Sequence, residues 1–520
     1  MGYNEILYLA VFLPLTAVLY RLLPEAAGKY FLLAVSWFYF YLNSGKLLLI
    51  LIAATVFVYI MAGLIQKAAP KSAGRKAAMG ITVAALFGML IGLKYTGFFI
   101  RTASQVSLSL FGNDLPLSAP KILVPVGISY YTLEAAGYIL EVYWGRTAAE
   151  KSFCRVGLFL GFFPQTLEGP IARWQDTAMQ FPGSRHLKDT KERSAAMSPE
   201  TVIMACLRIL WGMCKKLIVA DRLNTVVHEL YTNYASYDGV MIAVAAVTYA
   251  LQLYMEFSGM MDVVIGSARL FGIRLPENFR QPFFAQTASE FWRRWHITLG
   301  VWLKTYVFYP VTTSRTVMKW NRFARKKWGR YAAKAGTSFL ALAPVWLFNG
   351  LWHGPQWNYI FYGIYYLVIL MIEVILEPVK KAFYTRTGIR SKGAVPSALR
   401  LVRTWLIIFT GEMFFRADGL RAGLAMFRRM FQNFDLQRLW DGTLLELGLS
   451  RADWAAVTAG TAAVLIADLL REKGFSFSAW YQKRRLPVRW CVCYTLIFVL
   501  IIFGAYGSGY QPVDLIYKGF

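Results

Sequence analysis

The chain has 520 residues, of which 57% are hydrophobic and 16% aromatic, yet its formal net charge is +27. Soluble nucleic-acid-binding proteins can be this basic, but only 16% of these residues are charged, against about 25% in an average soluble domain. A disordered chain would lack the 17 Trp, 30 Tyr and 37 Phe. An integral membrane protein with basic loops accounts for both the hydrophobicity and the charge.

Apolar runs long enough to cross a bilayer core of about 30 Å recur along the sequence. No Lys or Arg precedes the first run and further runs follow at once, so we interpret it as a retained membrane helix rather than a signal peptide. Shorter runs suit re-entrant or interfacial segments. We therefore predict an all-α, polytopic membrane protein with about ten to twelve transmembrane helices. The longer runs are 4–23, 46–66, 78–100, 122–143, 200–220, 239–257, 335–352, 357–378, 402–415, 454–470 and 490–507, and the shorter ones 30–43, 154–167 and 296–311.

No linker separates a soluble domain from these runs, and no fixed-period repeat is visible. We therefore interpret residues 1–520 as a single polytopic domain. Its core motifs lie within 122–378, and peripheral helices are expected over 1–121 and 400–520. The five cysteines form no CxxC pair and the sequence has no HExxH, so neither a metal site nor a bound cofactor is predicted.

The acidic residues Glu134 and Glu141 lie in the apolar run 122–143, seven residues apart and so on one face of a helix. Ionisable side chains within membrane segments are rare and often mark a proton or substrate path. Two interpretations stay open. Either the two acids form a proton relay, or, as we favour, they pair with cationic groups at a helix end or funnel wall.

Two basic loops set the expected orientation, because Lys and Arg are retained on the cytoplasmic side. Residues 311–334 carry eight Lys or Arg, residues 380–403 carry seven, and neither loop contains an acid. We therefore place both loops in the cytoplasm. The two apolar segments between them then form a hairpin whose tip, 352–357, points away from the cytoplasm.

The segment around His296 is predicted to be one helix, because Thr287 and Glu290 have capping-box spacing at its start. One face of that helix would be apolar and the other basic. Two interpretations of the basic face stay open. Either the helix lies at the membrane interface with snorkelling cations, or the basic face forms a cytoplasmic mouth that holds an anionic acyl donor. The apolar face comprises Phe291, Trp295, Leu299, Trp302 and Tyr306, and the basic face Arg293, His296, Gly300 and Lys304.

The second notable histidine, His353, lies in the hairpin tip. A lone histidine in an apolar setting is usually a satisfied core residue, but an imidazole in a membrane more often faces a cavity and does chemistry. Pro355 disfavours helical backbone at Gly354, so His353 is expected at a helix C-terminus, with Asn349 one turn before it. There the helix dipole favours the protonated ring and makes the neutral ring a better base. The two histidines are thus predicted on opposite sides of the membrane, along a path through the protein.

Seven motifs resemble those of the membrane-bound O-acyltransferase family, specifically its bacterial branch of alginate and peptidoglycan O-acetyltransferases and teichoic-acid D-alanyl transferases. Two positions depart from the pattern, since Glu256 replaces a common Asp and Thr305 an Asp usual after the first histidine. The motifs are Leu123-Val-Pro-Val-Gly-Ile-Ser-Tyr-Tyr-Thr132, Phe163-Pro-Gln-Thr-Leu-Glu-Gly-Pro-Ile171, Glu256-Phe-Ser-Gly259 with Asp262, Pro276-Glu-Asn-Phe279, Phe291-Trp-Arg-Arg-Trp-His296, Gly350-Leu-Trp-His-Gly354 and Phe414-Phe-Arg-Ala417.

The resemblance implies a ring of helices around a tunnel, through which an acyl group passes from a cytoplasmic thioester to a hydroxyl at the outer face. His353 matches the catalytic histidine of the family and His296 its second histidine. We expect neutral His353 to act as general base. An acylated protein nucleophile is the weaker alternative, since no Cys or Ser stands next to His353. The expected substrate- or donor-binding residues are Asn349, Trp352, Arg293, Arg294 and Trp295.

The expected activity is acyl transfer, with acetyl as the leading group, to an extracytoplasmic envelope polymer or accessory protein. The expected donor is acetyl-CoA or an acylated phosphopantetheine carrier protein. Some members of the family hand the acyl group to an extracytoplasmic esterase-like partner. D-alanyl transfer from a carrier protein to teichoic acid is the alternative within the family. A transporter or flippase of envelope precursors and a structural scaffold are the rival classes. The expected location is a bacterial inner membrane, with contacts to lipid and none to nucleic acid.

Overall fold

The computed structural model describes residues 1–112, 120, 122–182, 198–388 and 393–506. The structure is 79% helical, and no strand occurs in the described ranges, which confirms the all-α prediction. Arg390 and Lys392 of the predicted basic loop lie outside the described residues. The chain divides into two compact units, one comprising residues 1–209 with 260–277 and the other residues 210–259 with 278–506.

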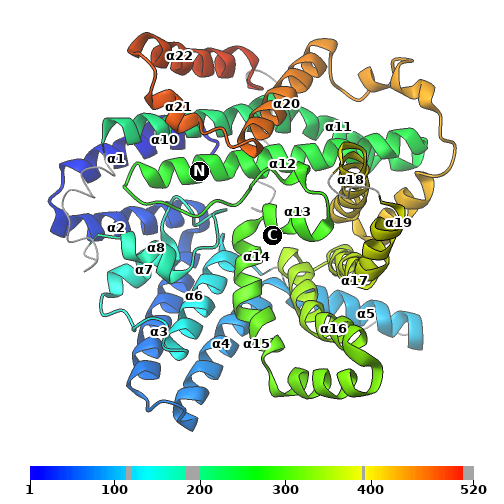
Figure 1. Cartoon of the computed structure of the whole chain (residues 1–520). Coiled ribbons are helices and arrows are strands. Elements are labelled where there is room, and N and C mark those ends of the chain that lie inside the picture. The colour runs from blue at the N-terminus through cyan, green and yellow to red at the C-terminus, as the bar shows by residue number, and fades with distance from the viewer. Residues whose placement is uncertain (113–119, 121, 183–197, 389–392, 507–520) are drawn as a thin grey trace. The chain divides into compact units, whose positions relative to one another are not determined.

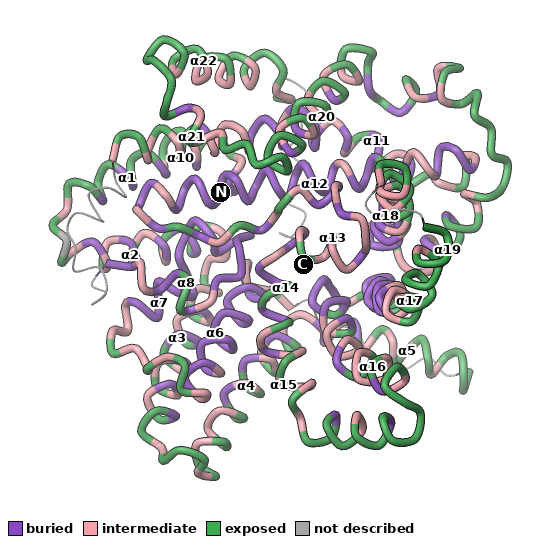
Figure 2. The backbone as a smooth tube through the Cα atoms, in the orientation of Figure 1, coloured by how far each residue is buried: buried purple, intermediate pink, exposed green. Residues whose placement is uncertain are grey.

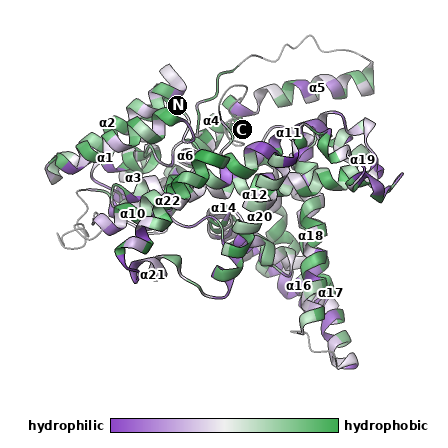
Figure 3. Ribbon diagram, turned by 90° about the horizontal axis from the view of Figure 1, so that it is seen from above, coloured by the Kyte–Doolittle hydropathy of each residue, from purple (hydrophilic) through white to green (hydrophobic). Residues whose placement is uncertain are grey.

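Six helical stretches within the described ranges are long and apolar enough to cross a membrane. The polytopic architecture is therefore confirmed, whereas the number of ten to twelve crossings remains a prediction. Figure 3 shows hydrophobic positions along α18 (Ala394–Arg416) and hydrophilic ones gathered in α19 (Gly419–Arg429). The six stretches are Ala26–Lys67, Ala73–Lys94, Gly239–Arg269, Trp357–Thr387, Arg451–Glu472 and Leu486–Phe503.

The first unit packs around α6 (Ile128–Tyr143), which is buried along most of its length (Figure 2). Gly127, just before α6, has a φ of +74°, and a Cβ there would lie 2.0 Å from the carbonyl oxygen of Thr166. Only glycine allows this close approach, so the first two motifs are locked together. The other helices, labelled in Figure 1, are α1 (Leu13–Leu22), α2 (Glu25–Ser44), α3 (Leu48–Lys67), α4 (Ala73–Lys94), α5 (Thr96–Phe111), α7 (Phe153–Gly161), α8 (Trp174–Thr177) and most of α10 (Pro199–Cys214).

The buried carboxylate of Glu134 in α6 accepts hydrogen bonds from the backbone N–H of Ala172 at 3.0 Å and from the side-chain amide of Gln165 at 3.3 Å. Both donors are neutral, so the expectation of a cationic partner is wrong for Glu134. The reason is that the irregular segment after α7 is buried as well, and its backbone amides need acceptors. Glu134 thus stabilises a non-helical stretch, as expected for a re-entrant segment within protein.

The second unit contains the larger helices of the chain. The part of α12 (Gly239–Arg269) that belongs to this unit ends at Gly259, and Figure 2 shows α12 almost entirely buried. Along the chain, short helices follow α12, and after them two long helices, α16 (Arg315–His353) and α17 (Trp357–Thr387), form a hairpin. The helices are α11 (Asp221–Thr232), α13 (Ala288–Arg294), α14 (Ile297–Leu303), α15 (Tyr309–Thr312), α16, α17, α18, α19, α20 (Arg451–Glu472), α21 (Phe477–Gln482) and α22 (Leu486–Phe503), with π-helical turns at Lys215–Ala220 and Lys304–Phe308.

A fully buried ion cluster explains the Glu256-Phe-Ser motif. The ammonium group of Lys216 lies 2.7 Å from Asp221 and 3.1 Å from Glu256, and all three side chains have at most 1% exposure. The neighbouring Lys215 donates to the hydroxyl of Ser258 at 3.2 Å. Since a buried charge without a partner is costly, removing any one member should destabilise this unit. The Glu in place of the usual Asp still reaches Lys216.

The two basic stretches are mainly helical rather than loops, which corrects the sequence-based expectation. Residues 315–328 form the first part of α16, which breaks at Gly329 (φ 83°). The first part packs back on the second, because the side-chain amide of Asn321 donates to the hydroxyl of Thr337 at 2.9 Å. Likewise α17 continues to Thr387 before α18 begins at Ala394. Lys and Arg are good helix formers, so a basic composition indicates sidedness but not an irregular backbone.

Candidate active site

His353 is the last residue of α16, as predicted from Pro355. Gly354 has extended backbone (φ 162°), and α17 starts three residues later at Trp357. The imidazole is buried, with 4% exposure. The helix C-terminus therefore places the ring inside the second unit.

Near His353, the helices α16 and α17 of the hairpin pack with their backbones in direct contact. A Cβ at Gly350 would lie 2.4 Å from the carbonyl oxygen of Tyr359, and one at Gly363 would lie 2.3 Å from that of Trp346. Such distances leave no room for any side chain larger than hydrogen. The two glycines thus hold the last turn of α16 against the first turns of α17.

Aromatic rings surround His353. Its ring meets Phe415 edge-to-face with centroids 4.9 Å apart and Tyr362 with centroids 5.8 Å apart. The hydroxyl of Tyr362 donates to the buried carboxylate of Glu412 at 2.9 Å. Asn349, one turn before His353, is also buried, and its Oδ1 accepts no hydrogen bond from the described part of the chain. These contacts leave an apolar wall with a few polar groups around the imidazole.

The backbone around His296 contradicts the predicted continuous helix. Helix α13 ends at Arg294, Trp295 is extended, and His296 has a left-handed backbone (φ 43°, ψ 51°) before α14 begins at Ile297. The backbone N–H of Arg280 donates to the carbonyl of Arg294, and that of Ile297 to the carbonyl of Asn278, each at 2.9 Å. These long-range bonds replace the helical ones.

The break changes which residues share a face. Trp295 and His296 are both buried, whereas Arg293 is exposed. His296 therefore does not lie on a basic surface with Arg293 and Lys304, as the helical pattern indicated. A single left-handed residue turns its side chain away from the helix pattern and into the protein.

The two histidines meet on one indole ring. The ring centroid of Trp352 lies 5.6 Å from that of His296 and 5.2 Å from that of His353. The hydrophobic core of a membrane is about 30 Å thick, so the prediction that they lie on opposite sides is wrong. Charge patterns assign loops to one side of the membrane, but they contain no information on how deeply α13 and α14 are buried in the second unit.

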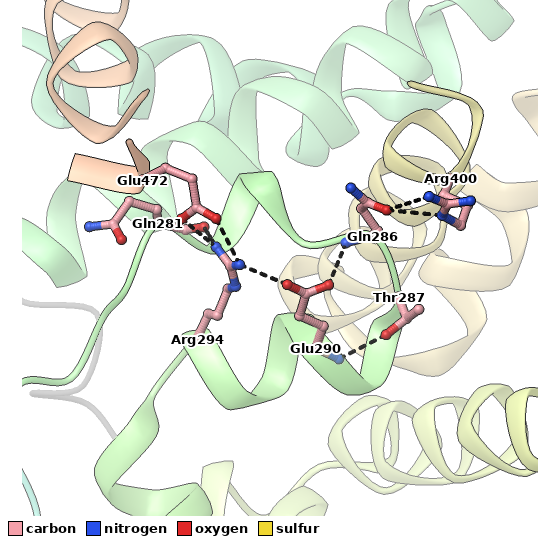
Figure 4. A network of polar contacts seen from close by, with 7 residues as sticks. All are labelled: Gln281, Gln286, Thr287, Glu290, Arg294, Arg400 and Glu472. Carbon is pink, nitrogen blue, oxygen red and sulfur yellow. Dashed lines mark hydrogen bonds and ion pairs between the residues drawn. The ribbon is translucent and has the colours of Figure 1, made fainter. Parts of the chain in front are cut away.

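Helix α13 is held at its start by a network of polar contacts (Figure 4). The hydroxyl of Thr287 accepts from the backbone N–H of Glu290 at 3.0 Å, which confirms the predicted helix start. The carboxylate of Glu290 accepts from the backbone N–H of Gln286 at 3.0 Å. Glu373 of α17 accepts from two further amides of this turn, those of Ala288 at 2.8 Å and Ser289 at 3.2 Å.

Arg294 is tied to carboxylates, as Figure 4 shows. Its guanidinium donates to Glu290 at 2.7 Å and to both oxygens of Glu472 at 2.8 and 2.9 Å. The hydrogen bond to Glu472 and the charge of Glu290 raise the pKa of Arg294. With these contacts Arg294 joins α13 to α20, a geometry that does not favour donor binding. Arg293, by contrast, is exposed and donates to the hydroxyl of Ser289 at 2.8 Å.

Comparison with known proteins places these residues in a family. The sequence profile of the membrane-bound O-acyltransferase family matches residues 149–416, slightly more than half of the chain, and this range includes both histidines. The chain belongs to the membrane-bound O-acyltransferase family. The resemblance stated on seven motifs is thereby confirmed, and the protein is an enzyme that transfers acyl groups.

Three relatives of this membrane-bound O-acyltransferase represent different substrates. A probable alginate O-acetylase of Pseudomonas aeruginosa is 30% identical over 463 residues, which are 89% of this chain and 79% of that protein. A peptidoglycan O-acetyltransferase of Helicobacter pylori is 25% identical over 82% of this chain and 79% of its own. A teichoic acid D-alanyltransferase of Bacillus subtilis is 27% identical over 56% of this chain and 71% of its own.

Sequence reasoning missed several residues around the histidines of this acyltransferase. Asn278 and Phe415 lie within motifs that carried the resemblance, but no role followed from their type. Tyr362 and Glu412 lie in apolar runs, where only the buried acid was a signal. Their contact with the His353 region depends on how α17 and α18 pack, which no local pattern records.

Proposed function

We propose that this enzyme transfers an acyl group, with acetyl first, from a thioester donor to hydroxyls of an extracytoplasmic envelope polymer or accessory protein, and that His353 is the general base. The observation that carries the proposal is the meeting of His353 and His296 on Trp352 inside an aromatic wall. An O-acyltransferase must activate a hydroxyl, and histidine is the side chain most often used for that purpose.

In the proposed reaction, neutral His353 takes the proton of the acceptor hydroxyl while the hydroxyl oxygen attacks the carbonyl carbon of the thioester. The carbon–sulfur bond breaks, the thiolate leaves, and it recovers the proton from the imidazolium to give the free thiol and the new ester. The aromatic rings of Phe415 and Tyr362 exclude water that would hydrolyse the thioester. The C-terminal end of α16 stabilises the transient imidazolium.

Asn349 and Trp352 are proposed to contact the reacting groups. Both are buried, and Trp352 lies between the two histidines. The uncommitted Oδ1 of Asn349 suits a hydrogen-bond donor of the substrate. Holding hydroxyl and thioester together in this way would lower the entropic part of the barrier. No protein nucleophile is invoked.

The donor is proposed to be acetyl-CoA or an acylated phosphopantetheine carrier protein, both of which carry phosphate. Its approach is supported by the first part of α16, where four exposed cations recur at helical spacing on the side opposite buried Val317 and Ala324. Exposed Arg293 adds a further cation, and Arg294 and Trp295 are retained only as supports of that segment. The four cations, here called the cationic stripe, are Arg315, Lys319, Arg322 and Lys326.

Charge reversal of the stripe tests this part of the proposal. The double variant Lys319→Glu/Arg322→Glu should raise the KM for the donor about tenfold or more while kcat changes little, because the chemical groups are untouched. Arg421→Glu, an exposed arginine of α19, is the matched control. An unchanged donor KM in the stripe variant would contradict docking at this helix.

Mass spectrometry of envelope polymers from cells with and without the protein tests the function itself. We expect an acetyl increment that depends on His353, since the two O-acetylating relatives cover more of this chain than the D-alanyl transferase does. An alanyl increment would favour the alternative, D-alanyl transfer from a carrier protein to teichoic acid. No increment, with solute movement in proteoliposomes that lack a thioester, would instead indicate a transporter. Residence in a bacterial inner membrane, with both basic segments facing the cytoplasm, is part of the proposal.

A further inference from the structure

A carboxamide lies between His296 and the start of α14. The Oδ1 atom of Asn278 is 3.2 Å from Nδ1 of His296, 3.1 Å from the backbone nitrogen of Thr298 and 2.9 Å from the hydroxyl of Thr298. Asn278 is 1% exposed and His296 3% exposed. Water does not compete for these contacts, so their geometry decides the state of the ring.

The orientation of this carboxamide follows from its neighbours. The backbone N–H of Thr298 can only donate, so the atom that faces it must be the oxygen of Asn278 and not its nitrogen. That same oxygen faces Nδ1 of His296 and can only accept. Nδ1 therefore carries a proton, and in the neutral imidazole the lone pair resides on Nε2.

The backbone keeps this arrangement in register. The Asn278 carbonyl accepts from the N–H of Ile297, and the Arg280 N–H donates to the carbonyl of Arg294, on either side of the left-handed residue. The ring of Phe257 meets that of His296 edge-to-face with centroids 4.9 Å apart. The imidazole is thus held both by its backbone and by a neighbouring ring.

We propose that Asn278 is a positioning residue that holds His296 in the Nδ1–H tautomer, so that Nε2 accepts a hydrogen bond from an O–H or N–H group of the substrate. The inference deepens the proposed function and rests on it only for the use made of Nε2. A carboxamide does this without adding charge, so it selects the tautomer without favouring the imidazolium. This gives the Asn of the Pro276-Glu-Asn-Phe279 motif a chemical role.

Nitrogen-15 NMR of labelled histidines tests the tautomer without any activity. The chain has only four histidines, and the His296 signals are assigned by their loss in His296→Gln. We expect Nδ1 of the purified full-length protein to be protonated, and Asn278→Leu to remove that preference. An unprotonated Nδ1 in the unmodified protein, or the same tautomer in Asn278→Leu, would overturn the proposal.

Acyl transfer by the same variants tests the consequence. Asn278→Leu keeps the volume but removes the acceptor, and kcat should fall severalfold at equal abundance, up to the loss of about tenfold expected when His296 itself is removed. Asn278→Asp restores an acceptor, so it should recover most of kcat, and its charge should move the acid limb of the pH–rate profile upward by about 1 in pH. Thr298→Val, which removes only the hydroxyl contact, is the matched control.

The two levels of the proposal fail in different ways. If Asn278→Leu and Asn278→Asp lose kcat equally and the pH profile does not move, Asn278 serves only folding. If His296→Ala keeps full activity, the use of Nε2 in transfer is wrong, while the NMR result still decides whether Asn278 sets the tautomer. A variant that does not accumulate is replaced by Asn278→Asp together with the spectrum of the unmodified protein, which tests the tautomer by itself.

Discussion

The segments that carry His353 and His296 reach the same indole ring in opposite ways. His353 ends a long helix, and its position follows from the next few residues, Gly354 and Pro355. His296 interrupts what the sequence predicts as a helix, and its position follows from two backbone bonds to residues 278 and 280. One histidine is thus placed by local chemistry and the other by a distant segment.

This difference predicts different sensitivities. The environment of His353 depends on close contact between α16 and α17, so it should tolerate changes elsewhere but not an added Cβ in the hairpin. The environment of His296 depends on polar ties from other parts of the second unit, including Glu373 and Glu472. Removing one of these polar contacts should therefore perturb the environment of His296 only in part, since each contact contributes separately.

The largest effect is expected for His353→Ala. If His353 is the general base, acyl transfer should fall by about 10²- to 10⁴-fold, with unchanged abundance. Ester release from the envelope polymer of cells expressing the variant measures this loss. His228→Ala, at an exposed histidine of α11, is the matched control. Normal acylation in the His353 variant would remove it from the mechanism.

A smaller loss, about tenfold, is expected for His296→Ala, because its proposed role is to orient a substrate group rather than to move the principal proton. The same ester assay is normalised to the amount of protein in the membrane. Should the variant change only that amount and leave the activity per molecule intact, His296 would be structural and the comparison would reduce to a single reactive histidine.

Gly350→Ala tests the hairpin contact. A Cβ 2.4 Å from the Tyr359 carbonyl forces α16 and α17 apart, at a cost of about 1 to 3 kcal/mol. Thermal unfolding of the detergent-solubilised protein should show a lower midpoint. Gly300→Ala, whose Cβ would have its nearest neighbour at 3.6 Å, should not lower it. Equal midpoints for both variants would show that the hairpin can relax.

The smallest effect is expected for Glu472→Gln. Arg294 and Glu472 have side-chain exposures of 18% and 34%, so solvent screens the pair and its loss should cost about 0 to 1 kcal/mol. Hydrogen exchange should become faster in α13, with little change in global stability. Lys334→Gln, which breaks a more exposed ion pair with Glu377, is the control and should leave exchange in α13 unchanged. No change in α13 for Glu472→Gln would show that Glu290 and the carbonyl of Gln281 are enough to hold Arg294.

The sequence alone identified the family, the all-helical membrane class, the two histidines and the end of α16 at His353. These depend on composition, on motifs read in order and on proline chemistry, all of which are local. The same reasoning wrongly predicted that the basic stretches at 311–334 and 380–403 are loops, because charge indicates the side of the membrane but not the backbone conformation. It also wrongly predicted that the two histidines lie on opposite sides of the membrane.

Tertiary structure decided what no local pattern carries. Pairing of residues 278–280 with 294–297 breaks the helix at His296, and that break turns the imidazole inward toward Trp352 and Asn278. The helical pattern of 287–306 was genuine, but long-range backbone hydrogen bonds outweighed it at one residue. The sequence thus determined which side chains are candidates for acyl transfer, while the packing of distant segments brought the two histidines to one indole ring.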